Sequence, residues 1–165
     1  MQRLIYRHQP KTTLKAATIA GFGSFIAIVV LAVIGNVSGY LWLIAPFGAS
    51  CGLMFGFHSS PFSQPANVIG GHLLSAFIGL GLHFLMPGQL VAEGLSVGIA
   101  VAAMMALRIV HPPAGATALV TYLTASNWLF LVFPIFSGSV LLVAMATTYH
   151  WLAKNSYPHP LPTKK

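Results

Sequence analysis

Long apolar runs separated by short polar connections make up most of the chain. Five of these runs have the length of about 17–25 residues with which a helix crosses a bilayer. They cover residues 16–34, 40–57, 68–85, 90–110 and 128–152. A sixth run, residues 113–123, reaches that length only if residues from about 108 to 124 cross together. The pattern predicts an all-α transmembrane bundle with about six membrane segments, the first of them a retained helix rather than a cleaved signal peptide.

The composition excludes a soluble domain. Of 165 residues, 56% are hydrophobic and 5% are charged, whereas soluble domains carry about 25% charged residues. Most of the basic side chains lie outside the apolar runs: Arg3, Arg7, Lys11, Lys15, Lys154, Lys164 and Lys165. This placement is typical of a topology signal rather than of a nucleic-acid-binding surface. We expect one transmembrane domain over residues 1–165, a polar tail at 153–165, cytoplasmic termini and no nucleic-acid partner.

A short motif occurs twice. Pro46-Phe-Gly-Ala-Ser50 and Pro113-Ala-Gly-Ala-Thr117 share the pattern P-x-G-A-S/T. If all six runs cross, the motifs open the second segment of two three-segment halves, residues 16–86 and 90–152. An odd number of segments per half predicts a 3+3 inverted repeat with two broken or half helices, a common transporter plan. The alternative is four full spans with two re-entrant segments, around residues 46–57 and 113–124.

The repeated motif has the chemistry of an anion site. Proline suits the first turn of a helix, where the next N–H groups are left unpaired and meet the positive end of the helix dipole. Glycine allows a close approach to the backbone, and serine or threonine adds a hydroxyl. The expected ligand-binding positions are Pro46, Gly48, Ala49 and Ser50 in the first motif and Pro113, Gly115, Ala116 and Thr117 in the second. The alternative is a pair of capped helices that pack well and bind nothing.

Polar residues near the motifs extend the candidate site. His72 and His111 lie in apolar surroundings, where an ionisable side chain is a functional candidate, and Asn67 is placed to line an entry with a neutral donor. Because Glu93 is the single acid, histidine is the natural proton carrier. Cys51 is the one cysteine, and the histidines lack the spacing of a metal site. We therefore expect no metal, no cofactor, no catalytic residues and no enzymatic activity.

The motifs resemble those of the HPP family of small integral membrane proteins. The resemblance rests on five blocks in the expected order, which are Pro46 to Ser50, Ser59-Ser-Pro61, Gln64-Pro65, Asn67-Val-Ile-Gly-Gly-His72 and His111-Pro-Pro-Ala-Gly-Ala-Thr-Ala118. The family is usually described as having four transmembrane helices, which differs from the six segments predicted above. Some members, in cyanobacteria and chloroplasts, are nitrite transporters. The resemblance thus implies nitrite as the leading substrate and the plasma membrane of a bacterium or cyanobacterium as the location.

Together these features predict a transporter or channel for a small monovalent anion, and nitrite is the leading candidate substrate. One alternative is an ammonia or cation channel that uses the membrane histidines, and another is a non-transporting structural membrane protein. A homo-oligomer is expected, because six short helices enclose little volume and small residues recur at four-residue spacing. These pairs are Gly35/Gly39, Gly52/Gly56 and Gly94/Gly98.

Overall fold

The computed structural model describes residues 5–124 and 127–160, which fold into a helical bundle without strands. Arg3, Lys164 and Lys165 lie outside these residues. The α-helices within them are α2 (Leu14–Ser38), α3 (Ala45–Gly56), α4 (Pro65–Leu85), α5 (Leu90–Ala106), α6 (Pro112–Thr124) and α7 (Ser137–Leu152). A 3₁₀ turn, η1 (Pro61–Ser63), precedes α4, and an irregular segment, η2 (Leu131–Phe136), leads into α7. The predicted all-α membrane bundle is confirmed.

The helices differ in length in the way that the motifs predict. Three helical segments are long and apolar enough to cross a membrane, namely α2, α4 and the combined segment Leu131–Leu152, and α5 is a shorter apolar helix. By contrast, α3 has 12 residues and α6 has 13. At 1.5 Å per residue these two helices are about 18 and 20 Å long, well short of a hydrocarbon core of about 30 Å. Each motif therefore opens a half-length helix.

Local sequence explains where several helices begin and end. The Thr13 hydroxyl caps α2 by accepting a hydrogen bond from Ala16 N at 3.2 Å, and Gly39 ends the helix in the left-handed conformation with φ 74°. Pro46 lies in the first turn of α3 and Pro112 begins α6. In η2, Phe133 leaves the helical conformation immediately before Pro134, whose ring cannot continue a regular helix.

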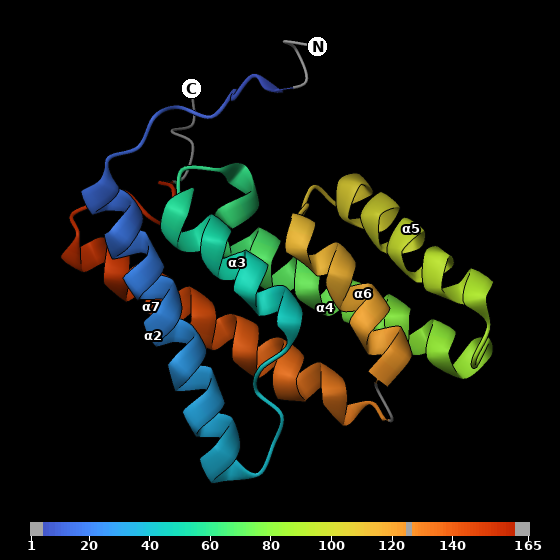
Figure 1. The fold of residues 1–165 in the computed structure, drawn as a ribbon. Coiled ribbons are helices and arrows are strands. Elements are labelled where there is room, and N and C mark those ends of the chain that lie inside the picture. The colour runs from blue at the N-terminus through green and yellow to red at the C-terminus, as the bar shows by residue number, and fades with distance from the viewer. Residues whose placement is uncertain (1–4, 125–126, 161–165) are drawn as a thin grey trace.

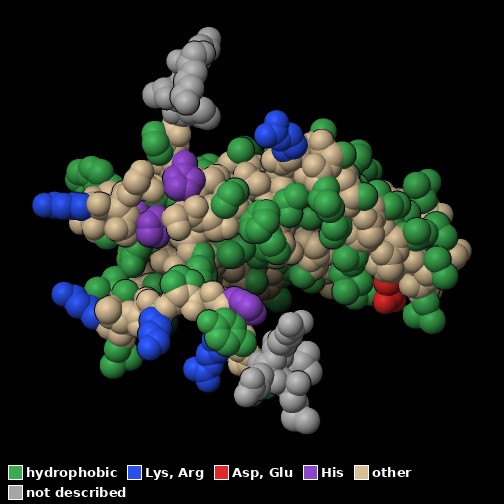
Figure 2. Space-filling model, turned by 90° about the horizontal axis from the view of Figure 1, so that it is seen from above, with side chains coloured by type: hydrophobic (Ala, Val, Ile, Leu, Met, Phe, Trp, Pro, Cys, Tyr) green, Lys and Arg blue, Asp and Glu red, His purple; other side chains and the backbone are tan. Residues whose placement is uncertain are grey.

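Successive helices alternate in direction, so the two half-length helices α3 and α6 run in opposite directions (Figure 1). The chain enters α2 and leaves α7 at the same end of the bundle, the upper end in Figure 1. The loop between α3 and α4 and the start of α6 also lie there. Figure 2 looks down on this end, and most of the side chains coloured as Lys, Arg or His in that view surround it. Several basic groups therefore lie at this end of the bundle.

Two groups of helices make up the bundle. An apolar core joins α2, α3 and α7, with Leu31, Phe47, Met54 and Leu142 fully buried in it. On the other side, α4 packs most extensively against α6 and next against α5. Gly79 of α4 lies directly against the backbone carbonyl of Ala118 in α6, where a Cβ atom would clash. α6 also contacts α3, so the two motif helices are neighbours, and a residue of each motif reaches α4.

Candidate functional site

Four buried polar side chains meet where α3, α4 and α6 come together. They are Ser50 from α3, His72 from α4, His111 immediately before α6, and Thr117 from α6, and none has any exposed surface. We call this group the buried polar cluster. Burying polar groups costs free energy unless each finds a hydrogen-bond partner. The cluster meets that requirement with contacts among its own members and two backbone carbonyls.

Ser50 is the centre of the cluster. Its Oγ lies 2.9 Å from His72 Nε2 and 2.8 Å from His111 Nε2, and 3.2 Å from the carbonyl oxygen of Pro46. On the far side of the first ring, His72 Nδ1 lies 2.7 Å from Thr117 Oγ1. The two imidazole rings pack edge to face with centroids 4.9 Å apart. Serine and threonine from the two motifs are therefore linked through one histidine.

Two further contacts fix the histidine rings. His111 Nδ1 donates to the carbonyl oxygen of Phe62, in η1, at 2.7 Å. The ring of Phe47 meets His72 edge to face, with centroids 5.1 Å apart and the planes at 90°. Gly71 makes room for His111, because a Cβ atom there would lie 2.9 Å from the Cβ of His111. Phe62 was not predicted as a site residue, since a backbone carbonyl leaves no signature in the sequence.

The first backbone amide after each motif proline is already paired, which differs from the expectation that these amides are free donors. Phe47 N donates to the carbonyl oxygen of Ile44 at 3.0 Å, and Ala114 N donates to that of His111 at 2.9 Å. Proline has no N–H, so Pro112 and Pro113 supply no donor at the start of α6. The donors available at this point of the bundle are side-chain hydroxyls and imidazoles.

The other predicted site residues lie around the cluster rather than in it. Pro46 contributes its carbonyl, and Pro113 is buried in the first turn of α6. Asn67 Nδ2 donates to the carbonyl oxygen of Val110 at 2.9 Å and so fastens the segment that leads into His111. The remaining four point elsewhere: Gly48, Ala49 and Ala116 are exposed, and a Cβ atom on Gly115 would face Val101 of α5 at 3.9 Å. Binding by any of these residues remains a prediction.

A second polar group, not predicted from the sequence, joins the chain's last described residues to the loop between α3 and α4. Tyr157 Oη donates to the Ser63 carbonyl at 2.9 Å, His159 N donates to Gln64 Oε1 at 2.9 Å, and His159 Nε2 donates to the Ser59 carbonyl at 2.8 Å. His58 packs on His150 with ring centroids 4.4 Å apart. Burial lowers the pKa of His58, and the nearby His159 lowers it further. Ser59, Ser63 and Gln64 lie on both sides of Phe62 in the sequence, and the Phe62 carbonyl holds His111.

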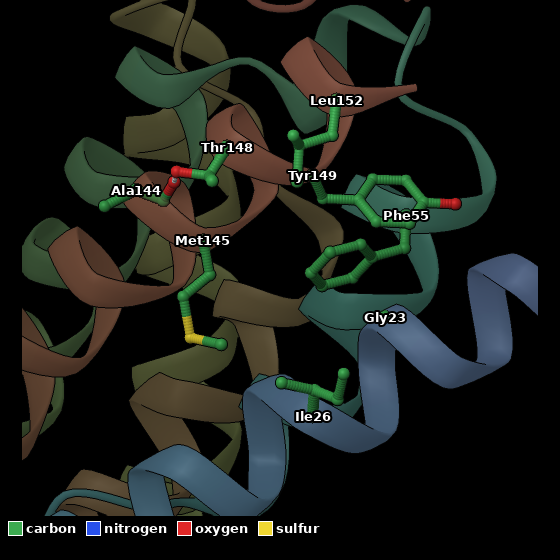
Figure 3. Close-up of a pocket in the computed structure, with 8 residues that line it drawn as sticks. All are labelled: Gly23, Ile26, Phe55, Ala144, Met145, Thr148, Tyr149 and Leu152. Carbon is green, nitrogen blue, oxygen red and sulfur yellow. Dashed lines mark hydrogen bonds between the residues drawn. The ribbon is translucent and has the colours of Figure 1, made fainter.

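Two hollows described on the molecule lie away from the buried polar cluster. One, of about 360 Å³, opens between α2, α3 and α7, and Figure 3 shows its lining: Gly23, Ile26, Phe55, Ala144, Met145, Thr148, Tyr149 and Leu152. The other, of about 490 Å³, surrounds the connection from α2 to α3 and includes Asn36 and Trp42. Within residues 5–124 and 127–160, no three His, Cys, Asp or Glu side chains are grouped as metal ligands.

Comparison with known proteins places the chain in a family. The family model described as "HPP, transmembrane region" matches residues 9–158. A transmembrane protein of Dictyostelium discoideum is 33% identical over 148 residues, which cover 82% of this chain and 48% of the relative. A second transmembrane protein of that organism is 36% identical over 125 residues, covering 70% of this chain and 44% of the relative. The chain thus spans less than half the length of these curated relatives.

No solved structure matches the chain. The family match covers both motifs, all the described helices and the four residues of the buried polar cluster. The helical architecture, with long apolar segments, agrees with the transmembrane relatives. This chain belongs to the HPP family of transmembrane proteins.

Proposed function

We propose that the protein is a transporter or channel for a small monovalent anion, with nitrite as the leading substrate. The observation that carries the proposal is the shared position of Ser50 and Thr117. Each is the fifth residue of its motif, each lies in a half-length helix, and the two hydroxyls approach opposite nitrogens of His72. Half-helices that meet near the middle of a bundle are typical of transporter binding sites.

The chemistry of the cluster suits an anion better than a cation. Hydroxyl groups and imidazole N–H groups are hydrogen-bond donors, and a protonated imidazole supplies a positive charge. No carboxylate is part of the cluster, since Glu93 is the only acid in the sequence and lies in the first turn of α5. The amides of Phe47 and Ala114 are already paired with carbonyls. We therefore infer that the hydroxyl and imidazole side chains of the cluster bind the anion after a local opening of the cluster.

Nitrite comes from the family resemblance and not from the geometry. Some HPP proteins are nitrite transporters, and the blocks that carry the likeness include all four residues of the buried polar cluster. The geometry supports a small monovalent anion as a class, because one imidazolium offers one countercharge. Nitrate, formate and chloride are therefore the competitors to compare with nitrite. The location that we propose is the plasma membrane of a bacterium or cyanobacterium.

One observation favours a second candidate function. His72 and His111 are stacked edge to face in a buried, apolar environment, and neutral imidazole nitrogens can accept hydrogen bonds from ammonia. A channel for ammonia would use this histidine pair without needing a positive charge. Transport of an anion should be inhibited by competing anions and respond to membrane potential, whereas entry of neutral ammonia should do neither.

The experiment is uptake into proteoliposomes that contain the purified chain, with protein-free liposomes as the blank. We expect initial rates of nitrite uptake well above the blank, inhibition by excess unlabelled nitrite, and weaker inhibition by chloride. Ammonia entry, followed by the alkalinisation of a pH dye inside the vesicles, should equal that of the blank. Ammonia entry without nitrite uptake would establish the second candidate instead. Neither activity, with the helical content intact, would support a structural role.

A further inference from the structure

The hydrogen-bond partners of His111 determine which of its nitrogens carries the proton. Nδ1 lies 2.7 Å from the carbonyl oxygen of Phe62, and a carbonyl only accepts hydrogen bonds. Nδ1 is therefore protonated, and in the neutral ring Nε2 is an acceptor. The group facing Nε2 at 2.8 Å is the hydroxyl of Ser50, so Ser50 donates its single proton to His111.

The same reasoning then assigns His72. Because the Ser50 proton is used toward His111, Ser50 Oγ accepts from His72 Nε2 at 2.9 Å. His72 is consequently protonated on Nε2, and its Nδ1 accepts from the hydroxyl of Thr117 at 2.7 Å. The hydrogen bonds form one directed chain from Thr117 through His72, Ser50 and His111 to the Phe62 carbonyl. In this state each side chain of the cluster is satisfied while both rings are neutral.

The cluster also has a second arrangement in which every polar group is hydrogen-bonded, and this arrangement contains one more proton. If His111 takes up a proton on Nε2, that nitrogen becomes a donor and Ser50 can no longer donate to it. The Pro46 carbonyl, 3.2 Å from Ser50 Oγ, offers another acceptor one turn back in α3. After the hydroxyl rotates, Ser50 accepts from both histidines and donates to Pro46. The change needs no movement of either ring.

We propose that Ser50 is the proton switch of the His72–His111 pair, and that the pair takes up one proton from the aqueous phase in each cycle. A second proton is disfavoured, because two imidazolium rings with centroids 4.9 Å apart repel each other. The titratable groups that meet in the cluster are the two rings themselves. The other partners are the Ser50 and Thr117 hydroxyls, the Phe62 and Pro46 carbonyls, and the Phe47 ring.

This role deepens the proposed function and rests on it for its meaning in transport. One proton on the pair provides one positive charge, which balances one monovalent anion. When the pair gains or loses this proton, the Ser50 hydroxyl exchanges one hydrogen-bond acceptor for another, so no polar group of the cluster is left unpaired. The coupling of one proton to one anion then makes the loaded site electrically neutral, which lowers the cost of holding the anion in an apolar environment.

The test is nitrogen NMR of the full chain, labelled with ¹⁵N-histidine, in lipid nanodiscs across a pH titration. In the wild type we expect neutral His111 to be protonated on Nδ1, neutral His72 on Nε2, and the two rings to share one titration step. In Ser50→Ala, neutral His111 should stay protonated on Nδ1, because the Phe62 carbonyl remains. His72, left with the Thr117 hydroxyl alone, should become a mixture of tautomers, and the two rings should titrate separately. Ser50→Thr, which keeps the hydroxyl, should restore the wild-type pattern.

Several results would overturn the switch. One is a neutral wild-type His111 that carries its proton on Nε2 instead of Nδ1, a result that the wild-type spectrum alone would show. Another is a Ser50→Ala protein in which the His72 tautomer and the titration of both rings are the same as in the wild type. In proteoliposomes, nitrite uptake by Ser50→Ala should lose its pH dependence, and Ser50→Thr should recover it. If the NMR pattern follows Ser50 while the wild type moves no nitrite, the switch stands and the proposed substrate fails.

Discussion

The phenolic hydroxyl of Tyr157 donates a hydrogen bond to the backbone carbonyl of Ser63 at 2.9 Å, although the two residues are 94 positions apart. Ser63 directly follows Phe62, whose carbonyl fixes the ring of His111. The chain after α7 is thus fastened to the turn that orients one histidine of the buried polar cluster. Contacts of His159 with Ser59 and Gln64 strengthen the same attachment.

Tyr157→Phe should lower the free energy of unfolding by about 1 kcal/mol, because the Ser63 carbonyl loses its partner. Burial also raises the pKa of Tyr157 to about 12. The folded state therefore holds this proton more tightly than the unfolded state, whose phenol ionises near pH 10. The stability contributed by the phenol is full below pH 10 and lost as the pH rises toward 12.

Unfolding in detergent, followed by circular dichroism at pH 8 and at pH values up to 12, measures both effects. The destabilisation caused by Tyr157→Phe should be present at pH 8 and shrink as the wild type loses its phenolic proton. Tyr40→Phe is the matched control, since Tyr40 is half exposed. Equal stability of the Tyr157→Phe and wild-type proteins at pH 8 would mean that the contact is unimportant.

The interface between α4 and α6 is so close that a single added methyl group should lower the stability of the protein. Gly79→Ala places a Cβ atom against the backbone carbonyl of Ala118, which cannot rotate away as a side chain would. Overpacking of this kind costs about 1–3 kcal/mol. Gly81→Ala in the same helix is the control, because a Cβ atom there meets nothing within 4 Å. Thermal unfolding of the two variants should separate them clearly, with Gly81→Ala at or above the wild-type midpoint.

The sequence predicted the helices well, because apolar runs in a membrane protein have few structural options. Residues 16–34 and 68–85, for example, lie within α2 and α4. Pro46 and Pro113 were expected in the first turn of a helix, and both lie there. Ser50, His72, His111 and Thr117 were all candidates, and the fold brings them together.

Other features could not be read from the pattern. Pairing of the first amides in α3 and α6 depends on how the preceding backbone turns. The contact between His150 and the Met54 carbonyl joins residues 96 positions apart, and a distance of that kind leaves no periodic signal. Gly48 and Gly115 were expected beside the ligand, yet each lies two residues before the cluster hydroxyl. On a helix, that spacing points the two positions to nearly opposite faces.

We expect the protein to form a homo-oligomer through the outer face of α3. Cβ atoms on Gly48, Gly52 and Gly56 would meet nothing within 4 Å, so this small-residue face has no partner among the described residues of one chain. Close helix packing across small residues drives association in lipid. Native mass spectrometry from nanodiscs should show an oligomer for the wild type and mostly monomer for Gly52→Leu.

The control for this variant is Gly21→Leu in α2, where a Cβ atom is equally unhindered. Its oligomer should persist. A wild-type protein that is monomeric at all lipid-to-protein ratios, with uptake intact, would contradict the prediction.

The inverted-repeat plan predicts a specific topology. The connection between α4 and α5 lies at the end of the bundle opposite the described end of α7 (Figure 1). A reporter inserted after Pro87 should therefore face the periplasm, while reporters at either terminus face the cytoplasm, as the basic residues suggest. Alkaline phosphatase and green fluorescent protein fusions in a bacterial host make this measurement. Reporters after Pro87 and at the C-terminus that face the same side would rule out the 3+3 arrangement.

The most direct test of the account is nitrite uptake by Thr117→Val, which keeps the shape of the side chain and removes the hydroxyl that His72 Nδ1 contacts at 2.7 Å. Thr124→Val is the matched control on the same helix, because Thr124 is exposed and its hydroxyl donates to the Val120 carbonyl of its own helix. We predict that initial uptake rates in proteoliposomes fall roughly tenfold or more for Thr117→Val, in line with the loss of one buried hydrogen bond, and stay at the wild-type level for Thr124→Val. Wild-type uptake by a correctly folded Thr117→Val protein would contradict the claim that the buried polar cluster handles the anion.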